Sequence, residues 1–400
     1  MIQNSPAVWA LIALLFRLVM GSIVHIYSLN AGFEGFVPLS NFGDDIFYWE
    51  TAKQLSQGIV PEYIPNFYPW ALAGIISVFG ENIFLGKCLN ILISAVTVFL
   101  GCQITSEVAK ELQLSRRNIK YATNLTGLIL TFYPSQIFYS AQLIKDPLLV
   151  FFGMMNLYST VLILKGGNRK MWIIWLLTLV GAFTFRPYTA VALIVSFLIY
   201  LLFVWKAKTG KKLTVISLFL VFSAIVPFFL GKGFFALDYV LAWSDVEKVS
   251  QIREAGYSVG GSALELEIDY SSPVGFVLTY GLSFFTVMLG PFPWQIRAPI
   301  HLTALPEAIL SSSLLLYLVF SARRKDSLNR GDTEKLLIVF SIVLIAIVAF
   351  FSDNIGANNR LRLLPWNILF IYSAVCLARI RENRQISISE SRMKKTMFTS

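Results

Sequence analysis

Hydrophobic residues gather along this chain in long runs, separated by short polar segments. Many runs are about twenty residues long, the length that an α-helix needs to cross about 30 Å of hydrocarbon. The pattern therefore predicts an all-α, polytopic integral membrane protein with about ten transmembrane helices. The expected spans are residues 7–29, 84–106, 119–141, 147–164, 171–185, 188–205, 213–230, 299–321, 336–351 and 363–377.

Three further segments do not fit a full crossing. Residues 41–58 form a short amphipathic pattern with aromatic residues on one side, which suits a helix at the membrane interface. Residues 67–80 hold only about a dozen apolar positions, too few to span comfortably. If residues 273–297 crossed, the basic group at 323–325 would lie outside, so we expect a re-entrant or interfacial element there.

Composition agrees with a membrane protein and explains the net charge. Hydrophobic residues make up 56% of the chain and charged residues only 14%, against about 25% charged in soluble domains. The net charge is +10, and 22 of the 33 lysines and arginines fall in segments expected in the cytoplasm. That is the positive-inside pattern. We therefore expect a multi-pass protein of the cell (inner) membrane, with both termini cytoplasmic and no nucleic acid partner.

The chain has no internal repeat that would divide it. We expect one membrane unit over residues 1–379 and a basic cytoplasmic tail over 380–400 without regular structure. Within the unit, 30–82 is the first external loop and 232–297 the large external loop with the re-entrant segment. Residues 7–29 are too long for the apolar core of a signal peptide, so we expect them to be retained as the first span.

Two adjacent carboxylates, Asp44 and Asp45, stand in the first external loop. One of them could simply cap the interfacial helix and favour its positive end. A functional role is favoured by the other charges expected near the outer ends of spans, which are Asp146, Lys145, Arg186, Arg360 and Arg362. A charge costs about 2.5–3.5 kcal/mol near the centre of a spanning helix and less toward the interface. A single cation can snorkel to water, but the set is better explained by a shared polar site.

Two ionisable residues lie inside the first span, where such groups are functional candidates by default. His25 is near the outer end, and it is a candidate for substrate binding or a hydrogen-bonded, snorkelling side chain. Arg17 lies deeper, so we expect it to face protein rather than lipid.

Four cations beside a few acids suit an anionic ligand at the membrane boundary. Arginine forks and a lysine point charge bind phosphate oxygens well. A carboxylate near that phosphate could act as general base on an acceptor hydroxyl, while the cations stabilise charge on the leaving phosphate. This chemistry is glycosyl transfer from a polyprenyl-phosphate sugar.

The acidic pair after the first span, followed by Tyr48, Trp49, Ala52 and Gly58, resembles the first-loop signature of GT-C membrane glycosyltransferases. These are polyprenyl-phosphate-sugar-dependent enzymes such as protein mannosyltransferases and aminoarabinose transferases. The resemblance continues through further short motifs, which are Tyr68-Pro69, Phe79–Asn82, Pro134 with Asp146, Arg186, and Arg360 with Pro365. It covers most of residues 7–205 in spacing and, more weakly, 350–379.

The resemblance implies a GT-C-like fold in which Asp44 is the catalytic acid or base and Asp45 lies beside it. Asp146 would help to position the acceptor or a divalent cation. Lys145, Arg186, Arg360 and Arg362 would bind the lipid phosphate, with Tyr68 also at the substrate site. Mg²⁺ or Mn²⁺ shared by Asp44 and Asp146 is compatible with oxygen ligands, although the sequence does not require it. Many family members have Asp-Glu where this chain has Asp-Asp, and the acceptor, a glycan, lipid or protein, stays open.

Two other functions remain as alternatives. An O-antigen-type polymerase acting on lipid-diphosphate-linked units would also need external arginines. The 232–272 loop, the PFPW sequence at 291–294 and the NNRLR sequence at 358–362 suit such an enzyme. In that enzyme the arginines would be essential and Asp44 dispensable. A transporter or lipid flippase would place ionisable groups near the middle of the bilayer and would show internal repeats, which fits this sequence less well.

Overall fold

The computed structural model describes residues 5–37, 43–64, 66–166, 169–204, 268–296, 304–322, 331–352 and 354–399, together with single residues 217, 247, 251, 264 and 302. All regular elements in these residues are helices. The predicted all-α class is therefore confirmed for the part of the chain that the structure describes.

Six described helices are long and apolar enough to cross a membrane. They are α1 (Pro6–Asn30), α4 (Ile83–Glu111), α7 (Asp146–Leu164), α9 with its following turn (Pro187–Val204), α15 (Asp332–Phe351) and α17 (Leu363–Thr399). Shorter apolar helices are α3 (Tyr68–Phe79), α8 (Lys170–Phe185), α13 (Pro273–Leu289) and α14 (Leu305–Ala322). The expected span at 213–230 and most of the 232–272 loop lie outside the described residues.

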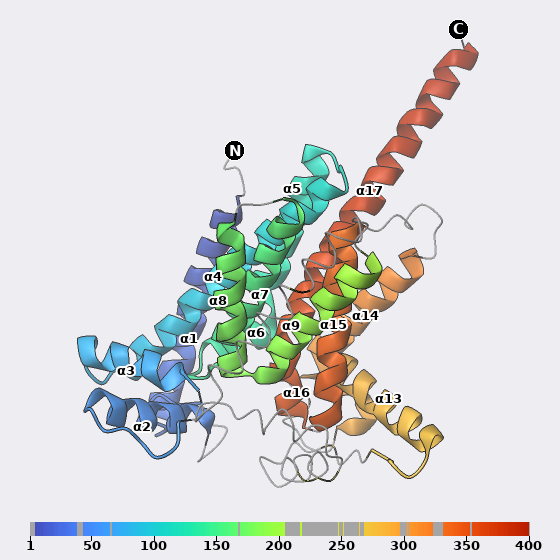
Figure 1. Cartoon of the computed structure of the whole chain (residues 1–400). Helices are drawn as coiled ribbons and strands as arrows, with labels where there is room; N and C mark the ends of the chain where they lie inside the picture. Colours follow the sequence, from blue (N-terminus) through green and yellow to red (C-terminus); the bar gives the residue numbers. More distant parts are fainter. Residues whose placement is uncertain are drawn as a thin grey trace.

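One expected span is built from two helices. Residues 119–141 contain Pro134, where α5 (Arg116–Phe132) ends and α6 (Pro134–Ser140) begins. Proline has no amide hydrogen to continue the hydrogen bonds of α5, but it is well suited to the first turn of a new helix. The break sets α6 and the turn after it close to the start of α7 (Figure 1).

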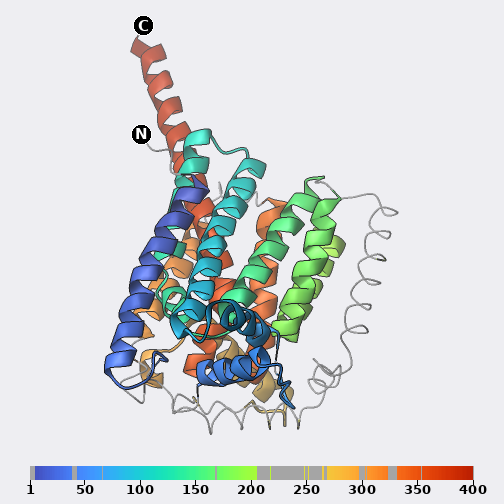
Figure 2. The ribbon, with the colours of Figure 1, turned by 90° about the vertical axis from the view of Figure 1, so that its left-hand side faces the viewer.

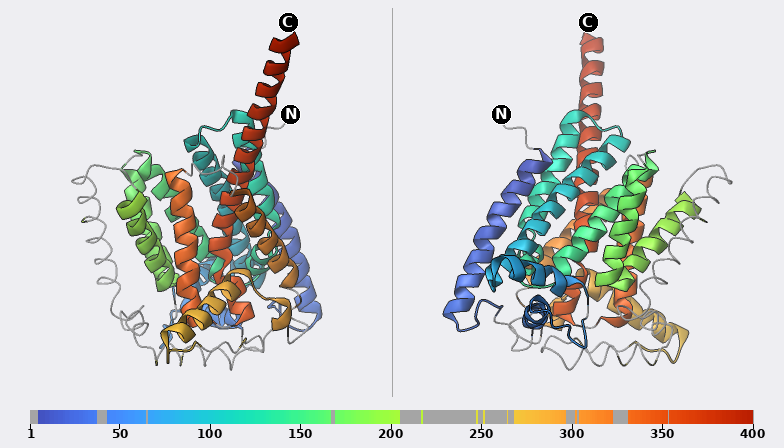
Figure 3. Two further views of the ribbon diagram at one scale, coloured as in Figure 1. Left: turned by 90° about the vertical axis from the view of Figure 1, so that its right-hand side faces the viewer. Right: turned by 60° about the vertical axis from the view of Figure 1, so that its left-hand side comes forward.

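The long helices run side by side as a bundle, and both termini lie at the same end of it (Figures 1 and 2). The short helices α2 (Asp44–Ser56), α3, α13 and α16 (Ile355–Leu361) gather at the opposite end. Figure 3 shows the same division from two further directions. Helices α2 and α3 pack against each other and lie across the bundle, as expected for interfacial helices.

Helix α1 presents two different faces. Leu11, Leu15 and Val19 are more than half exposed, as suits side chains that face lipid. On the opposite face the side chain of Arg17 is buried, and it donates hydrogen bonds to Leu130 O at 2.6 Å and to the hydroxyl of Ser94. The prediction that Arg17 faces protein is confirmed.

The carboxyl-terminal tail was predicted to lack regular structure, and this prediction was wrong. Helix α17 continues to Thr399 and extends well beyond the bundle (Figure 1). Its first turns after the span are held by contacts with the end of α4 and with α5. Glu382 accepts a hydrogen bond from Ser115 Oγ at 2.8 Å, and the guanidinium of Arg381 lies 4.6 Å from the centre of the Tyr121 ring. Side-chain contacts of this kind extend a helix that composition alone would leave unformed.

The buried arginine of α1 gives a test of this packing. We expect Arg17→Met to lower the free energy of unfolding by about 2 kcal/mol, because hydrogen bonds from a charged donor are lost and the Leu130 carbonyl is left with one partner fewer. Thermal unfolding in nanodiscs would measure the loss. Leu15→Met, on the exposed face of the same helix, is the control, and equal melting temperatures for the two variants would contradict the assignment.

Candidate functional site

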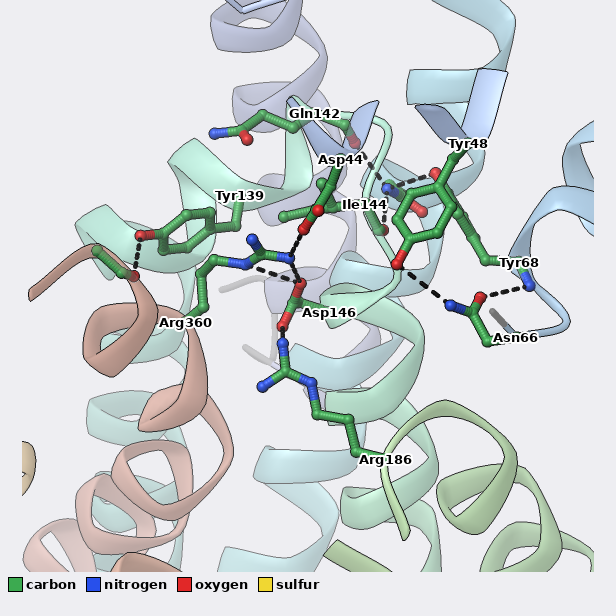
Figure 4. Close-up of polar contacts among 12 residues, drawn as sticks. Asp44, Tyr48, Asn66, Tyr68, Tyr139, Gln142, Ile144, Asp146, Arg186 and Arg360 are labelled. Carbon is green, nitrogen blue, oxygen red and sulfur yellow. Dashed lines mark hydrogen bonds and ion pairs between the residues drawn. The ribbon is translucent and has the colours of Figure 1, made fainter. Parts of the chain in front are cut away.

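The centre of the site is the carboxylate of Asp146, the first residue of α7. Its side chain is only 1% exposed. Oδ1 lies 2.6 Å from Arg186 Nη2, and Oδ2 lies 2.8 Å from Arg360 Nη2 (Figure 4). A buried carboxylate needs such partners, because an unpaired charge away from water is very costly.

The local sequence places Arg186 beside this carboxylate. Arg186 connects α8 and α9 in an extended conformation (φ −153°, ψ 100°) and precedes Pro187. A proline disfavours the helical conformation of the residue before it. Helix α8 therefore ends here, and the side chain of Arg186 turns toward Asp146. Arg186 Nη1 also donates to the hydroxyl of Tyr188 at 2.8 Å, which fixes the second arm of the guanidinium.

Arg360 of α16 bridges two carboxylates. Its Nη2 lies 2.7 Å from Asp44 Oδ2 and 2.8 Å from Asp146 Oδ2, and its Nε lies 3.1 Å from the same Asp146 oxygen. Asp44 is the first residue of α2, and its side chain is half exposed. Burial acts to lower the pKa of Arg360, but the charges of Asp146 and Asp44 outweigh it and hold that pKa above its ordinary value.

Lys145 adds a third cation immediately before Asp146. The residue is half-buried, and within the described part of the chain its ammonium makes no hydrogen bond or ion pair. Burial, followed by the nearby charge of Arg186, lowers the pKa of Lys145 to about 8. Below that pH, Lys145, Arg186 and Arg360 outnumber Asp44 and Asp146 by one charge. The net positive charge favours binding of an anion.

Two tyrosines and two asparagines join α2 and α3 to the turn before Asp146 (Figure 4). Asn90 of α4 donates to the hydroxyl of Tyr68 at 2.9 Å and to Ile144 O at 2.9 Å. Asn66 donates to the hydroxyl of Tyr48 at 3.2 Å, and the Tyr48 and Tyr68 rings meet edge to face with centres 5.3 Å apart. Tyr68, which was predicted to lie at the substrate site, therefore supports the turn before Asp146 through Asn90.

The hydroxyl of Tyr139 holds α16 in place. It donates to Gly356 O at 3.3 Å, which joins α6 to α16 near Arg360 (Figure 4).

Three predicted site residues lie away from this cluster. Asp45 is buried and accepts a hydrogen bond from Val37 N at 3.1 Å. Arg362 is buried between Gly290 O and Glu307, with 3.4 Å from its Nη2 to the Glu307 oxygen. His25 packs against the Phe84 ring and lines a separate cavity of about 340 Å³, with Glu34, Trp49, Glu50 and Lys53 among its other lining residues.

The arrangement does not fit a divalent cation shared by Asp44 and Asp146. Mg²⁺ requires oxygen ligands in near-octahedral geometry, whereas the two carboxylates are joined by the guanidinium of Arg360. In the described ranges no group of three or more His, Cys, Asp or Glu side chains is placed to hold a metal. Metal use by this protein stays a prediction.

No protein-family model matches the chain, and neither curated proteins nor solved structures gave a match. Fold and site define its class directly. In the described residues it is an all-helical protein with six helices of membrane-spanning length and a charged site at one end of the bundle.

The two carboxylates on Arg360 differ in burial, and this difference predicts different costs of removal. We expect Asp146→Asn to lower the free energy of unfolding by about 3–5 kcal/mol, because two arginines lose their buried counter-ion. Asp44→Asn should cost about 1 kcal/mol or less, since its ion pair is half exposed. Thermal unfolding of both variants in the same lipid would measure the two losses. Equal losses in the two variants would show that burial does not determine how much each carboxylate contributes to the free energy of unfolding.

Proposed function

We propose that the protein is a membrane glycosyltransferase that moves a sugar from a polyprenyl-phosphate-linked donor to an extracytoplasmic acceptor in cell-envelope glycan or glycoconjugate synthesis. The observation that carries the proposal is the meeting of Asp44, Asp146, Arg186, Arg360 and Lys145 at one end of the bundle. They come from three separate helices (α2, α7 and α16), the junction between α8 and α9, and the turn before α7. Together they combine cations for a phosphate with an accessible carboxylate.

The donor phosphate would bind at Arg360 and Lys145. Arg186 is committed to buried Asp146 and Tyr188, so it mainly holds the site together. Arg360 is partly exposed, and its contact with Asp44 is the half-exposed side of the cluster. A phosphate oxygen can therefore reach Arg360 from that side, and the unpaired ammonium of Lys145 supplies a second contact.

Asp44 is the group best placed to act as general base. It would accept the proton of the acceptor hydroxyl while the acceptor oxygen bonds to the anomeric carbon of the sugar. The bond from that carbon to the phosphate oxygen breaks, and polyprenyl phosphate leaves with the bonding electrons. Arg360 and Lys145 would stabilise the charge that develops on the leaving oxygen.

We further infer about ten crossings of the cell membrane, with both termini cytoplasmic and the site on the extracytoplasmic side. Supporting this topology, both termini lie at the end of the bundle opposite α2 and α16 (Figure 1). Basic residues such as Arg116, Arg117 and Lys165 belong to the termini's end, at the start of α5 and the end of α7. A site at the opposite end would meet a lipid-linked donor where its head group leaves the bilayer.

The first prediction from this function concerns Asp44. Asp44→Asn should abolish transfer of sugar from a panel of polyprenyl-phosphate sugars while binding of the lipid is retained, because the base is lost and the cations remain. The assay measures sugar released from the lipid or moved to an added acceptor.

Glu50→Gln is the matched control, since Glu50 lies on the same helix and pairs with Lys53 on the surface. Full turnover by Asp44→Asn would show that Asp44 is not the general base. If Arg186 and Arg360 variants were then inactive, the polymerase acting on lipid-diphosphate-linked units would be favoured. If wild-type protein turned over no donor with any acceptor tested but moved lipid between leaflets, the flippase would be favoured.

A second prediction concerns pH. Because the pKa of Lys145 is lowered to about 8, its charge is present below that pH and is lost as the pH rises through it. Binding of a polyprenyl phosphodiester should therefore weaken as the pH rises through about 8. Lys145→Arg should remove this dependence, since a guanidinium stays charged. Equilibrium binding measured from about pH 6 to about pH 10, a range around the ordinary lysine pKa, would compare the pH dependence of the two proteins. The same decline in both proteins would exclude Lys145 as its source.

A further inference from the structure

Glu307 is a buried acid that the proposed reaction does not use. It lies in the first turn of α14, and only 7% of its surface is exposed. Its Oε2 accepts hydrogen bonds from Ser135 N at 3.0 Å and from Ser135 Oγ at 2.6 Å. Its Oε1 lies 3.4 Å from Arg362 Nη2. One side chain of α14 therefore joins the start of α6 to the end of α16.

The contact with Ser135 completes the beginning of α6. The first amides of a helix have no partner inside it, and a carboxylate is favoured at that end. Pro134 begins α6 and has no amide hydrogen to satisfy. Ser135 is the next residue, and its amide hydrogen bonds to Glu307. The acid of α14 thus acts as a cap for a helix that belongs to another part of the chain.

Arg362 is the second partner of this acid. It directly follows α16, two residues after Arg360, and its side chain is only 2% exposed. A buried guanidinium is very costly without an opposite charge, and Glu307 supplies that charge. The other terminal nitrogen of Arg362, Nη1, donates to Gly290 O at the end of α13. Both terminal nitrogens of Arg362 are therefore bound to buried partners, whereas Arg360 is partly exposed.

Helix α6 consequently holds α16 at two points. The hydroxyl of Tyr139 donates to Gly356 O at 3.3 Å, in the first turn of α16. At the other end of α16, Arg362 is connected to the start of α6 through the shared acid. Arg360 lies between these two points, and α6 leads through a short turn into α7, which begins with Asp146. The same short helix therefore places both partners of the central ion pair.

We propose that Glu307 is a positioning residue that fixes α16 on α6, so that Arg360 meets its two carboxylates. Arg362 belongs to this support and is not a ligand of the donor phosphate. Both residues act on the site through Arg360. The effect on catalysis rests on the proposed function, whereas the effect on the placement of α16 does not.

A double-mutant cycle tests whether Glu307 and Arg362 act as a pair. Glu307→Gln and Arg362→Gln should each lower the melting temperature in nanodiscs by about 5 °C, because each leaves one buried charge unpaired. The double variant should recover much of the loss, since two amides bury no charge and can bond to each other. Additive losses would overturn the proposal.

A second measurement reads the position of α16 without any reaction. Spin labels would be attached through Phe47→Cys, an exposed position of α2, and Ala357→Cys, a half-buried position of α16. The background replaces the native cysteines by alanine, which are Cys88, Cys102 and Cys376. Glu307→Gln should broaden the distribution of distances between the two labels, because α16 loses one of its two attachments to α6. An unchanged distribution would overturn the proposal.

Glu334→Gln is the matched control for a merely structural effect. Glu334 is also a buried acid paired with an arginine, Arg379 of α17. It lies in the first turn of α15, and α15 ends just before α16 begins, so this pair is at the opposite end of the bundle. Glu334→Gln should lower the melting temperature by a similar amount and leave the distances between the labels unchanged. Equal broadening in both variants would overturn the proposal.

A milder variant covers the case in which Glu307→Gln does not fold. Glu307→Asp keeps the charge, but its side chain is shorter by one methylene group, so it cannot reach Ser135 and Arg362 at once. The distribution of distances should again broaden. An unchanged distribution in Glu307→Asp would overturn the proposal in that case.

Turnover separates this proposal from the proposed function. With a working donor, Glu307→Gln should lower kcat/KM about tenfold through misplaced Arg360, and the double variant with Arg362→Gln should regain much of it. A double variant no better than Arg362→Gln alone would make Arg362 a phosphate ligand and overturn its role as support. If no donor is turned over but the cycle and the labels behave as expected, the proposed function fails and the positioning of α16 stands. Unchanged turnover in Glu307→Gln would reject the positioning role in catalysis.

Discussion

The buried carboxylate of Asp146 is the interaction on which the described site depends. It neutralises Arg186 and Arg360, which come from different parts of the chain, where isolated arginines would be very costly. Three elements must therefore pack correctly at once, namely the start of α7, the junction of α8 with α9, and α16. Because Arg360 also holds Asp44, the interfacial helix α2 is joined to the bundle through the same contact. Removing the central charge would loosen the site and its support together.

The second constraint is the way in which α2 and α3 are attached. These helices pack mainly on each other, and polar contacts act together with their buried apolar side chains to fix their position on the bundle. Asn90 does this from within α4, because one amide donates both to Tyr68 and to the backbone of the turn before Asp146. An asparagine in a spanning helix would be unfavourable if its amide were unpaired. The bonds that its Nδ2 donates offset part of that cost and give the loop that carries Asp44 a specific position.

The sequence predicted the all-helical class and the collection of charges, because hydropathy and the distribution of Lys and Arg report local properties of the chain. It placed Asp44, Asp146, Lys145, Arg186 and Arg360 at one face, and the structure brings these five together. It could not separate Asp45 or Arg362 from them, since the direction of a side chain depends on packing. Asn90 was missed for the same reason. A polar residue inside an otherwise apolar span was the signal that could have found it. The helical tail also depends on distant contacts, through Ser115 and Tyr121.

The two acids that pair with Arg360 differ in exposure, and this difference gives them different roles in the site. Asp146 is enclosed, so it balances the arginines permanently and can hardly exchange its partners. Asp44 is half exposed, and its bond to Arg360 competes with water and with any arriving anion. A phosphate that takes Arg360 would release Asp44 at the moment when a base beside that phosphate becomes useful. Under the proposed function, the resting ion pair would protect Arg360, and the donor that binds Arg360 would also free the carboxylate of Asp44.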